Sequence, residues 1–148
     1  MLKTLILGLI FLANVSIGSA KACDFECSYK KHIKSIETKD YATFESTLTK
    51  GDKLVLILPN GKYIDDAVEY RNMMKDWFSD DGWNFKTKII RVEETSEMGS
   101  VLLHVNYSEQ ERAGKPYQAQ QYLSLIFKKQ NNEWLLVHDQ NTTIPTSR

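Results

Sequence analysis

Hydrophobic residues recur at helical spacing in three parts of the chain. Residues 24–36 place apolar side chains at steps of four, four and three, which is one face of a helix: Phe25, Tyr29, Ile33 and Ile36. Residues 40–48 predict a short second helix, with Asp40 placed to cap its first turn. The helical period returns in residues 65–82, through Ala67, Tyr70, Met74 and Trp77, with Met73 and Phe78 alongside. Asp66 and Glu69 stand at the start of this third helix in the spacing of a capping box.

The rest of the chain has the pattern of β-strands. Residues 53–64, KLVLILPNGKYI, contain two apolar runs around an Asn-Gly turn, which predicts a β-hairpin between the second and third helices. After the third helix, turn-rich breaks separate four strands: 83–93, 100–109, 117–129 and 133–141. Strands this close in sequence are expected to pair antiparallel as a meander. The predicted fold class is therefore α+β, in one domain over residues 23–148.

Strand alternation sorts the side chains of the sheet into two sets. The mixed set contains apolar and polar residues: Leu102, His104, Asn106, Tyr122, Ser124, Ile126, Trp134, Leu136, His138 and Gln140. The apolar set ends on one acid: Val101, Leu103, Val105, Leu123, Leu125, Phe127, Leu135, Val137 and Asp139. Because the few helices are expected to cover only one face of the sheet, one set should face them and the other should face away.

The order of elements, with LPNGKYIDDAVEY at the third helix and NNEWLLVHDQNT in the last strand, resembles the NTF2-like superfamily. Its SnoaL-like and DUF4440-type domains are the most similar in pattern. In those families the last strand often has the pattern Trp-x-Ile-x-His-x-His. Trp134, Leu136 and His138 follow that pattern, whereas Gln140 replaces the second histidine. The resemblance implies a cystatin-like cone, in which three N-terminal helices pack on a curved antiparallel sheet and close a pocket.

Two registers of the sheet follow from that fold. We favour the one in which the mixed set lines the concave pocket, and the apolar set, including Leu103, Leu123 and Leu125, forms a homodimer interface on the convex side. In the alternative register, the apolar set is the core and the mixed set faces solvent.

The favoured register supplies four candidate ligand-binding residues: His104, Tyr122, His138 and Gln140. Trp77 and Tyr63 are further candidates, because aromatic side chains could form a pocket wall; the alternative, favoured for most of the aromatic residues, is burial in the core. Asp139 is then expected to point away from the pocket. For an enzyme, His104 or His138 would be the base, because a neutral histidine accepts protons near neutral pH. The sequence assigns no catalytic residue, no metal site and no cofactor.

Residues 1–22 have the composition of a secretory signal. Lys3 precedes an apolar run too short to cross a membrane, which takes about 20 residues. Small residues follow, so cleavage is expected after Ala20 or Ala22. Lipidation of Cys23 is disfavoured by the residues before it, and no stable membrane anchor is expected. In an oxidising compartment, Cys23 and Cys27 are expected to pair within the chain or with a second chain.

Charge excludes some partners. The chain has 19 basic and 19 acidic residues, and removal of Lys3 and Lys21 with the signal leaves 17 basic against 19 acidic, a net charge of −2. Without a basic patch, nucleic acid is not an expected partner. The expected protein is secreted or periplasmic and binds a small ligand with apolar and polar parts. An isomerase- or cyclase-like enzyme and a dimerising interaction module are the alternatives.

Overall fold

The structure, a computed structural model, describes residues 23–145. Three helices and six strands follow in chain order: α1 (Phe25–Glu37), α2 (Tyr41–Ser46), β1 (Lys53–Ile57), β2 (Tyr63–Asp66), α3 (Ala67–Phe78), β3 (Trp83–Glu94), β4 (Met98–Arg112), β5 (Lys115–Gln130) and β6 (Glu133–Thr143). The strands form one sheet in the order β2-β1-β6-β5-β4-β3. The predicted α+β plan, the hairpin and the antiparallel meander from β3 to β6 are confirmed. The parallel pairing of β1 with β6, which joins hairpin and meander, was not predicted.

Each helix begins at an aspartate that caps it. The carboxylate of Asp24 accepts a hydrogen bond from the backbone N–H of Cys27, and that of Asp40 accepts one from Thr43. Asp66 accepts two, from Val68 and Glu69. These bonds satisfy backbone donors that have no partner within the helix.

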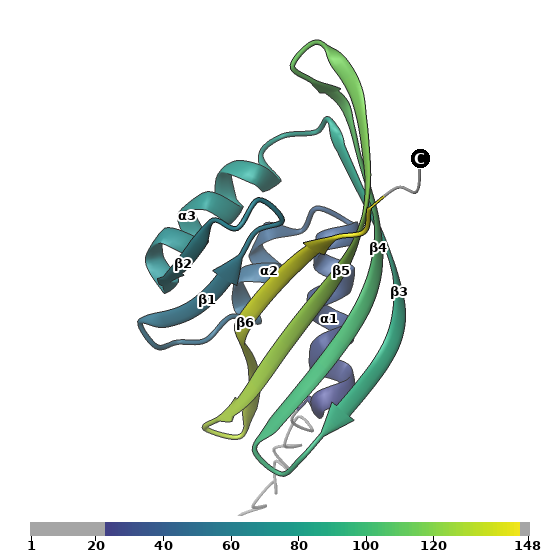
Figure 1. Cartoon of the computed structure of the whole chain (residues 1–148). Coiled ribbons are helices and arrows are strands. Elements are labelled where there is room, and N and C mark those ends of the chain that lie inside the picture. Colours follow the sequence, from purple (N-terminus) through teal and green to yellow (C-terminus); the bar gives the residue numbers. More distant parts are fainter. Residues whose placement is uncertain (1–22, 146–148) are drawn as a thin grey trace, which may run out of the picture.

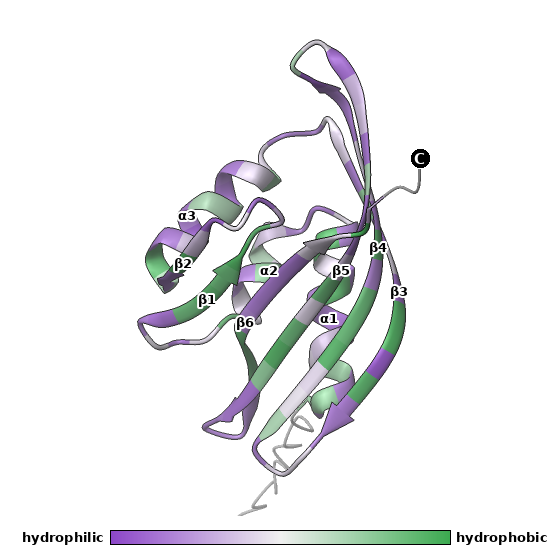
Figure 2. Cartoon of the chain, viewed as in Figure 1, coloured by the Kyte–Doolittle hydropathy of each residue, from purple (hydrophilic) through white to green (hydrophobic). Residues whose placement is uncertain are grey.

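The helices lie along one face of a curved sheet, and the hydrophobic core fills the space between them (Figure 1). Hydrophobic residues are concentrated in β1 and in the central parts of β4 and β5, whereas the projecting end of the β4–β5 hairpin is mostly hydrophilic (Figure 2). Phe25 of α1 packs so closely on Gly99 of β4 that a Cβ atom there would lie 2.4 Å from its ring. Glycine at position 99 therefore lets α1 approach the sheet.

In β4 and β5 the apolar set of strand residues faces the helices, so our favoured register was wrong. Leu103, Leu123 and Leu125 are at most 2% exposed within a single chain. They form the core and cannot be the surface of a homodimer interface. A charge at Leu123 would therefore destabilise the monomer itself. The physical reason is simple: the helices offer apolar side chains, and burial favours the sheet face that matches them.

A β-bulge in β6 changes the side-chain alternation of the last strand. Phe127 pairs with Leu136 and the preceding residue, Ile126, pairs with His138, which leaves Val137 as an extra residue in β6. Before the bulge, Trp134 and Leu136 pack in the core. After it, the residue facing the helices is Asp139 rather than His138, because an extra residue exchanges the two faces of a strand.

His32 of α1 is fully buried between α2 and the sheet. Its Nδ1 lies 2.7 Å from Oγ1 of Thr47, which in turn donates to the carbonyl oxygen of Phe44. The histidine therefore donates from Nδ1, and Nε2 is a buried acceptor without a partner in the described part of the chain. Burial lowers the pKa of His32 to about 3.

Cys23 and Cys27 form a disulfide within the chain, across the first turn of α1. The sequence had left intrachain and interchain pairing open. Over residues 23–145, no helix is long and apolar enough to cross a membrane. The predicted signal at residues 1–22 lies outside the described residues.

The buried His32 predicts loss of stability in acid. Its pKa lies below the ordinary value of 6.5, so the unfolded chain binds the proton first, and the histidine's contribution to stability falls as the pH drops from 6.5 toward 3. The raised pKa of Asp139 acts in the opposite direction, because there the folded chain binds the proton first. From about pH 7 to about pH 5, the histidine should remove on the order of 1–2 kcal/mol of unfolding free energy. Urea unfolding at several pH values measures this.

His32→Leu should lose much less stability on acidification than the wild type. The control is His104→Leu, on the sheet face away from the helices, which should retain the wild-type pH profile. Equal acid sensitivity of wild type and His32→Leu would show that another group causes the loss.

Candidate functional site

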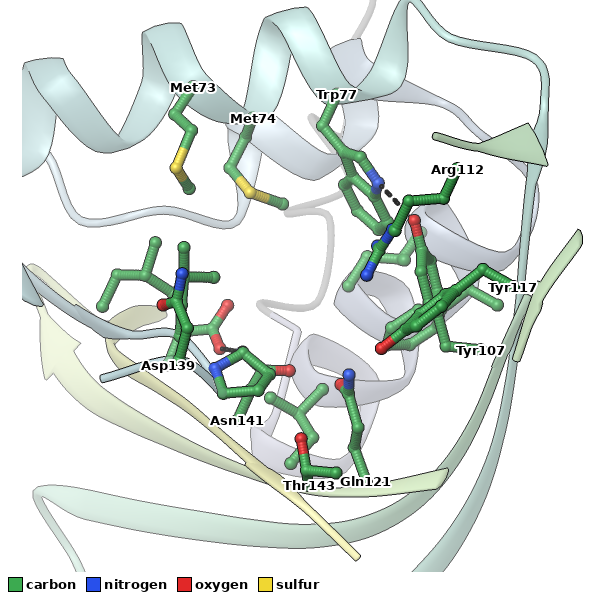
Figure 3. Close-up of a pocket in the computed structure, with 17 residues that line it drawn as sticks. Met73, Met74, Trp77, Tyr107, Arg112, Tyr117, Gln121, Asp139, Asn141 and Thr143 are labelled. Carbon is green, nitrogen blue, oxygen red and sulfur yellow. Dashed lines mark hydrogen bonds between the residues drawn. The ribbon is translucent and has the colours of Figure 1, made fainter. Parts of the chain in front are cut away.

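A cavity of about 510 Å³ opens between α3 and the sheet. One wall is α3, the floor comes from β5 and β6, and the hairpin end of β4 and β5 closes the far side (Figure 3). Most lining residues are apolar or aromatic: Ile36, Leu56, Leu58, Pro59, Met73, Met74, Trp77, Phe85, Tyr107, Tyr117 and Leu123. The polar lining residues are few: Asn60, Arg112, Gln121, Asp139, Asn141 and Thr143. An apolar cavity of this size with a few polar groups is typical of a small-molecule site.

Asp139 lies at one end of this cavity. The residue is 6% exposed, because β6 is flanked by β1 and β5 and Tyr70 of α3 lies against the carboxylate. The Tyr70 hydroxyl of α3 donates to Oδ2 at 3.0 Å, and Nδ2 of Asn141 donates to Oδ1 at 2.8 Å. Burial raises the pKa of Asp139 to about 6, and the two hydrogen bonds oppose this rise. Burial, followed by the charge of Asp139, raises the pKa of Tyr70 well above its usual value, so the tyrosine remains a donor.

An aromatic cluster with one ion pair lies at the opposite end. Nε1 of Trp77 donates to the Tyr107 hydroxyl at 3.3 Å, and that hydroxyl donates to Glu109 at 2.6 Å. Arg112 forms an ion pair with Glu109, and its guanidinium lies 3.6 Å from the ring centre of Tyr117. Burial, together with the hydrogen bond to Glu109, raises the pKa of Tyr107 to about 12. The cluster is therefore held in place by partners of its own, and its charge is balanced.

Gln121 and Thr143 lie on the floor between the two ends, as Figure 3 shows. The arrangement offers a ligand an apolar body site, an aromatic end and a carboxyl group at the other end. Chemically, Asp139 is the one lining residue whose pKa lies near neutrality, so it could exchange a proton with a bound molecule. Within residues 23–145, no cluster of three or more histidine, cysteine or acidic side chains could hold a metal ion.

The structure brings only one of the six predicted ligand-binding residues to the cavity, namely Trp77. His138 pairs with Ile126 and Gln140 with Ser124, so both lie on the face away from the helices. His104 and Tyr122 are paired with each other on that same face. Tyr63, on edge strand β2, is 60% exposed and does not line the cavity. The placement of His104, Tyr122, His138 and Gln140 was wrong because the register assigned the wrong face to the helices, and Tyr63 was wrong because in β2 it is the neighbouring Ile64 that is buried.

Sequence reasoning missed three polar residues that line the cavity, Asp139, Asn141 and Arg112, and the hydrogen bond from Tyr70 to Asp139. Asp139 was recognised as the only acid of the apolar set, but that set was assigned to the face away from the pocket, and the bulge that separates Trp134 and Leu136 from His138 was not foreseen. The signal that could have found it is the run Trp134-Leu135-Leu136-Val137. Four apolar residues in a row do not fit the alternation of a strand with one polar face, and such a run is compatible with a bulge.

The chain belongs to the SnoaL-like domain family, which matches residues 28–145. The fold is also that of solved NTF2-like structures. A ketosteroid isomerase-like protein from Erwinia carotovora atroseptica superposes with a TM-score of 0.65 at 14% identity, over 82% of this chain and 94% of that one. An NTF-2 like protein from Shewanella oneidensis gives 0.59 at 16% identity, over 78% and 93%.

The CamKII hub homology domain of Chlamydomonas reinhardtii is a third similar structure, with a TM-score of 0.60 at 11% identity, over 86% of this chain and 100% of that one. At these identities the similarity establishes the fold. No curated protein sequence matches the chain.

Proposed function

We propose that this domain binds a small, largely apolar organic molecule in the cavity between α3 and the sheet. The observation that carries the proposal is the cavity itself: about 510 Å³, with apolar and aromatic walls and a buried carboxyl group at one end. A volume of this size accommodates a molecule of one to a few rings. The ligand's polar group would bind at Asp139, and its body would lie against Met73, Met74 and Trp77.

Filling the cavity should abolish binding without unfolding the domain. In Met73→Trp the added ring would enter the cavity from α3, and affinity for the neutral fluorescent dye prodan should fall at least about tenfold. The matched control is Val68→Trp on the same helix, where the native side chain is 62% exposed and outside the cavity. Fluorescence titration measures the prodan affinity of both variants. Mass spectrometry of the purified protein identifies any retained ligand. Equal dye binding by the two variants would place the binding site elsewhere.

Proton transfer by Asp139 is a second candidate function. The observation that favours it is the pKa of about 6, since a carboxyl group that titrates near neutrality can both accept and release a proton. Tyr70 and Asn141 hold its two oxygens in place. The similarity to a ketosteroid isomerase-like protein agrees with this candidate, although it extends only to the fold. This hypothesis replaces His104 and His138 as base candidates.

If Asp139 is a base, turnover should increase with pH through about 6 and then level off, because only the ionised carboxylate accepts a proton. The assay follows the conjugated ketone formed from a β,γ-unsaturated ketosteroid by its ultraviolet absorbance. Asp139→Asn should lower kcat by at least about a hundredfold. His138→Gln, the neighbouring change on the opposite face, should retain activity. Turnover that survives Asp139→Asn would rule out this role.

We further propose that the protein is exported, secreted or periplasmic, after cleavage at Ala20 or Ala22. The disulfide between Cys23 and Cys27 supports this, because disulfides persist in oxidising compartments. It also occupies the sulfur that a lipid anchor on Cys23 would need. The intact mass of protein from the native host tests the proposal: an uncleaved or lipidated chain would contradict it.

Finally, we propose that the domain self-associates through the sheet face away from the helices. In residues 23–145 no element covers this face, and Tyr122 on it is 44% exposed. The similarity to a hub homology domain supports assembly as a property of this fold. Analytical ultracentrifugation of wild type and Tyr122→Lys is the test. A monomeric wild type at micromolar concentration would refute it.

A further inference from the structure

The carboxylate of Asp139 has no positively charged partner. Its two hydrogen-bond donors, the Tyr70 hydroxyl and the Asn141 amide, are both neutral. Across the described residues, no lysine, arginine or histidine forms an ion pair with it. Buried carboxylates are ordinarily paired with a cation, because removal of a charge from water is costly. The fold itself thus leaves this charge uncompensated.

The carboxylate also has acceptor capacity to spare. An ionised carboxyl group has about four lone-pair sites, and the Tyr70 and Asn141 bonds occupy one on each oxygen. Asp139 lines the cavity, so a molecule in the cavity can reach the remaining sites. The group that would use them best carries several N–H donors and a positive charge.

We propose that the ligand class of this cavity is an organic amine, bound as its ammonium ion at Asp139 with an aromatic or apolar body. This inference rests on the proposed binding function and specifies the ligand. The ammonium ion supplies the missing counter-charge and donates to the free lone pairs of the carboxylate. Such charge-assisted bonds are about twice as strong as neutral ones.

The rest of the cavity fits an amine with an aromatic body. Trp77, Tyr107 and Tyr117 lie at the end opposite Asp139, so a molecule with a cationic head and a ring would extend between the two ends (Figure 3). Arg112 is the other charged lining residue, and its ion pair with Glu109 leaves no net charge at the aromatic end. An acidic ligand would have to displace Glu109 from Arg112, and would place a second negative charge near Asp139.

Amine binding should depend on the ionisation of Asp139 alone. The groups that face it are Tyr70 from α3, Asn141 on its own strand, Leu56 of β1 and Leu125 of β5. Of these only Tyr70 titrates, and it does so far above neutrality. Because a protonated carboxyl group carries no charge, the affinity for an amine should fall as the pH drops below about 6.

The test compares ligands of one shape and different charge. Calorimetric titration at about pH 7.5 uses tryptamine, tryptophol and indole-3-acetate, which share the indole ring and carry an ammonium, a hydroxyl and a carboxylate group. Wild-type protein should bind tryptamine at least about tenfold more tightly than tryptophol, and indole-3-acetate most weakly. In Asp139→Asn the preference for the amine should disappear. Asp65→Asn, the same change at an exposed acid outside the cavity, should retain it.

A second measurement uses wild-type protein alone. Between about pH 7.5 and about pH 5, affinity should fall for tryptamine and stay nearly constant for tryptophol. Equal affinity for the two at every pH, or a preference that persists in Asp139→Asn, would overturn the inference. If prodan binds in the cavity and tryptamine does not, the amine inference fails while the binding function stands. If neither binds, both fail.

Discussion

One extra residue in the last strand determines which side chains of β6 face the cavity. The bulge at Val137 lets Trp134 and Leu136 pack in the core and then places Asp139 on the same face. Without it, His138 would point toward α3, and the acid would lie on the open face of the sheet. Past the bulge, β6 pairs with β1 through Val55 and His138, so the parallel joint between hairpin and meander begins where the alternation changes. The cavity depends on the bulge and on this parallel pairing of β1 with β6.

The consequence is a balance between burial and hydrogen bonding at Asp139. A carboxylate on a central strand loses its contact with water, and desolvation disfavours its charge. The hydroxyl of Tyr70 and the amide of Asn141 recover part of that loss but bring no charge. The resulting pKa of about 6 leaves the group able to titrate near neutrality, and responsive to whatever enters the cavity. At the other end, Glu109 and Arg112 satisfy each other, so the cavity has one charged end and one neutral aromatic end.

Much of the fold could be predicted from local pattern. The apolar stripe of α1, the aspartate caps, the Asn-Gly turn and the four long strands all follow from residues within a few positions of one another. In the structure the strands are longer than predicted, because β4 and β5 continue to a two-residue turn at Ala113 and Gly114, both at positive φ. Of the site, Trp77 was predicted, as an aromatic residue that could form a pocket wall. Its partner at the other end, Asp139, was not.

The sequence by itself determined the elements, their order and the family, because helical and strand periods, caps and turns are short-range properties of the chain. It could not decide which face of the sheet the helices would cover, since both sets of side chains alternate equally well and the choice depends on what packs opposite. The apolar run of residues 134–137 is compatible with a bulge, but the position of the extra residue is defined by pairing between β5 and β6. Only the tertiary structure placed Tyr70 against Asp139, 69 positions apart in the chain, and so created a buried acid facing an apolar cavity.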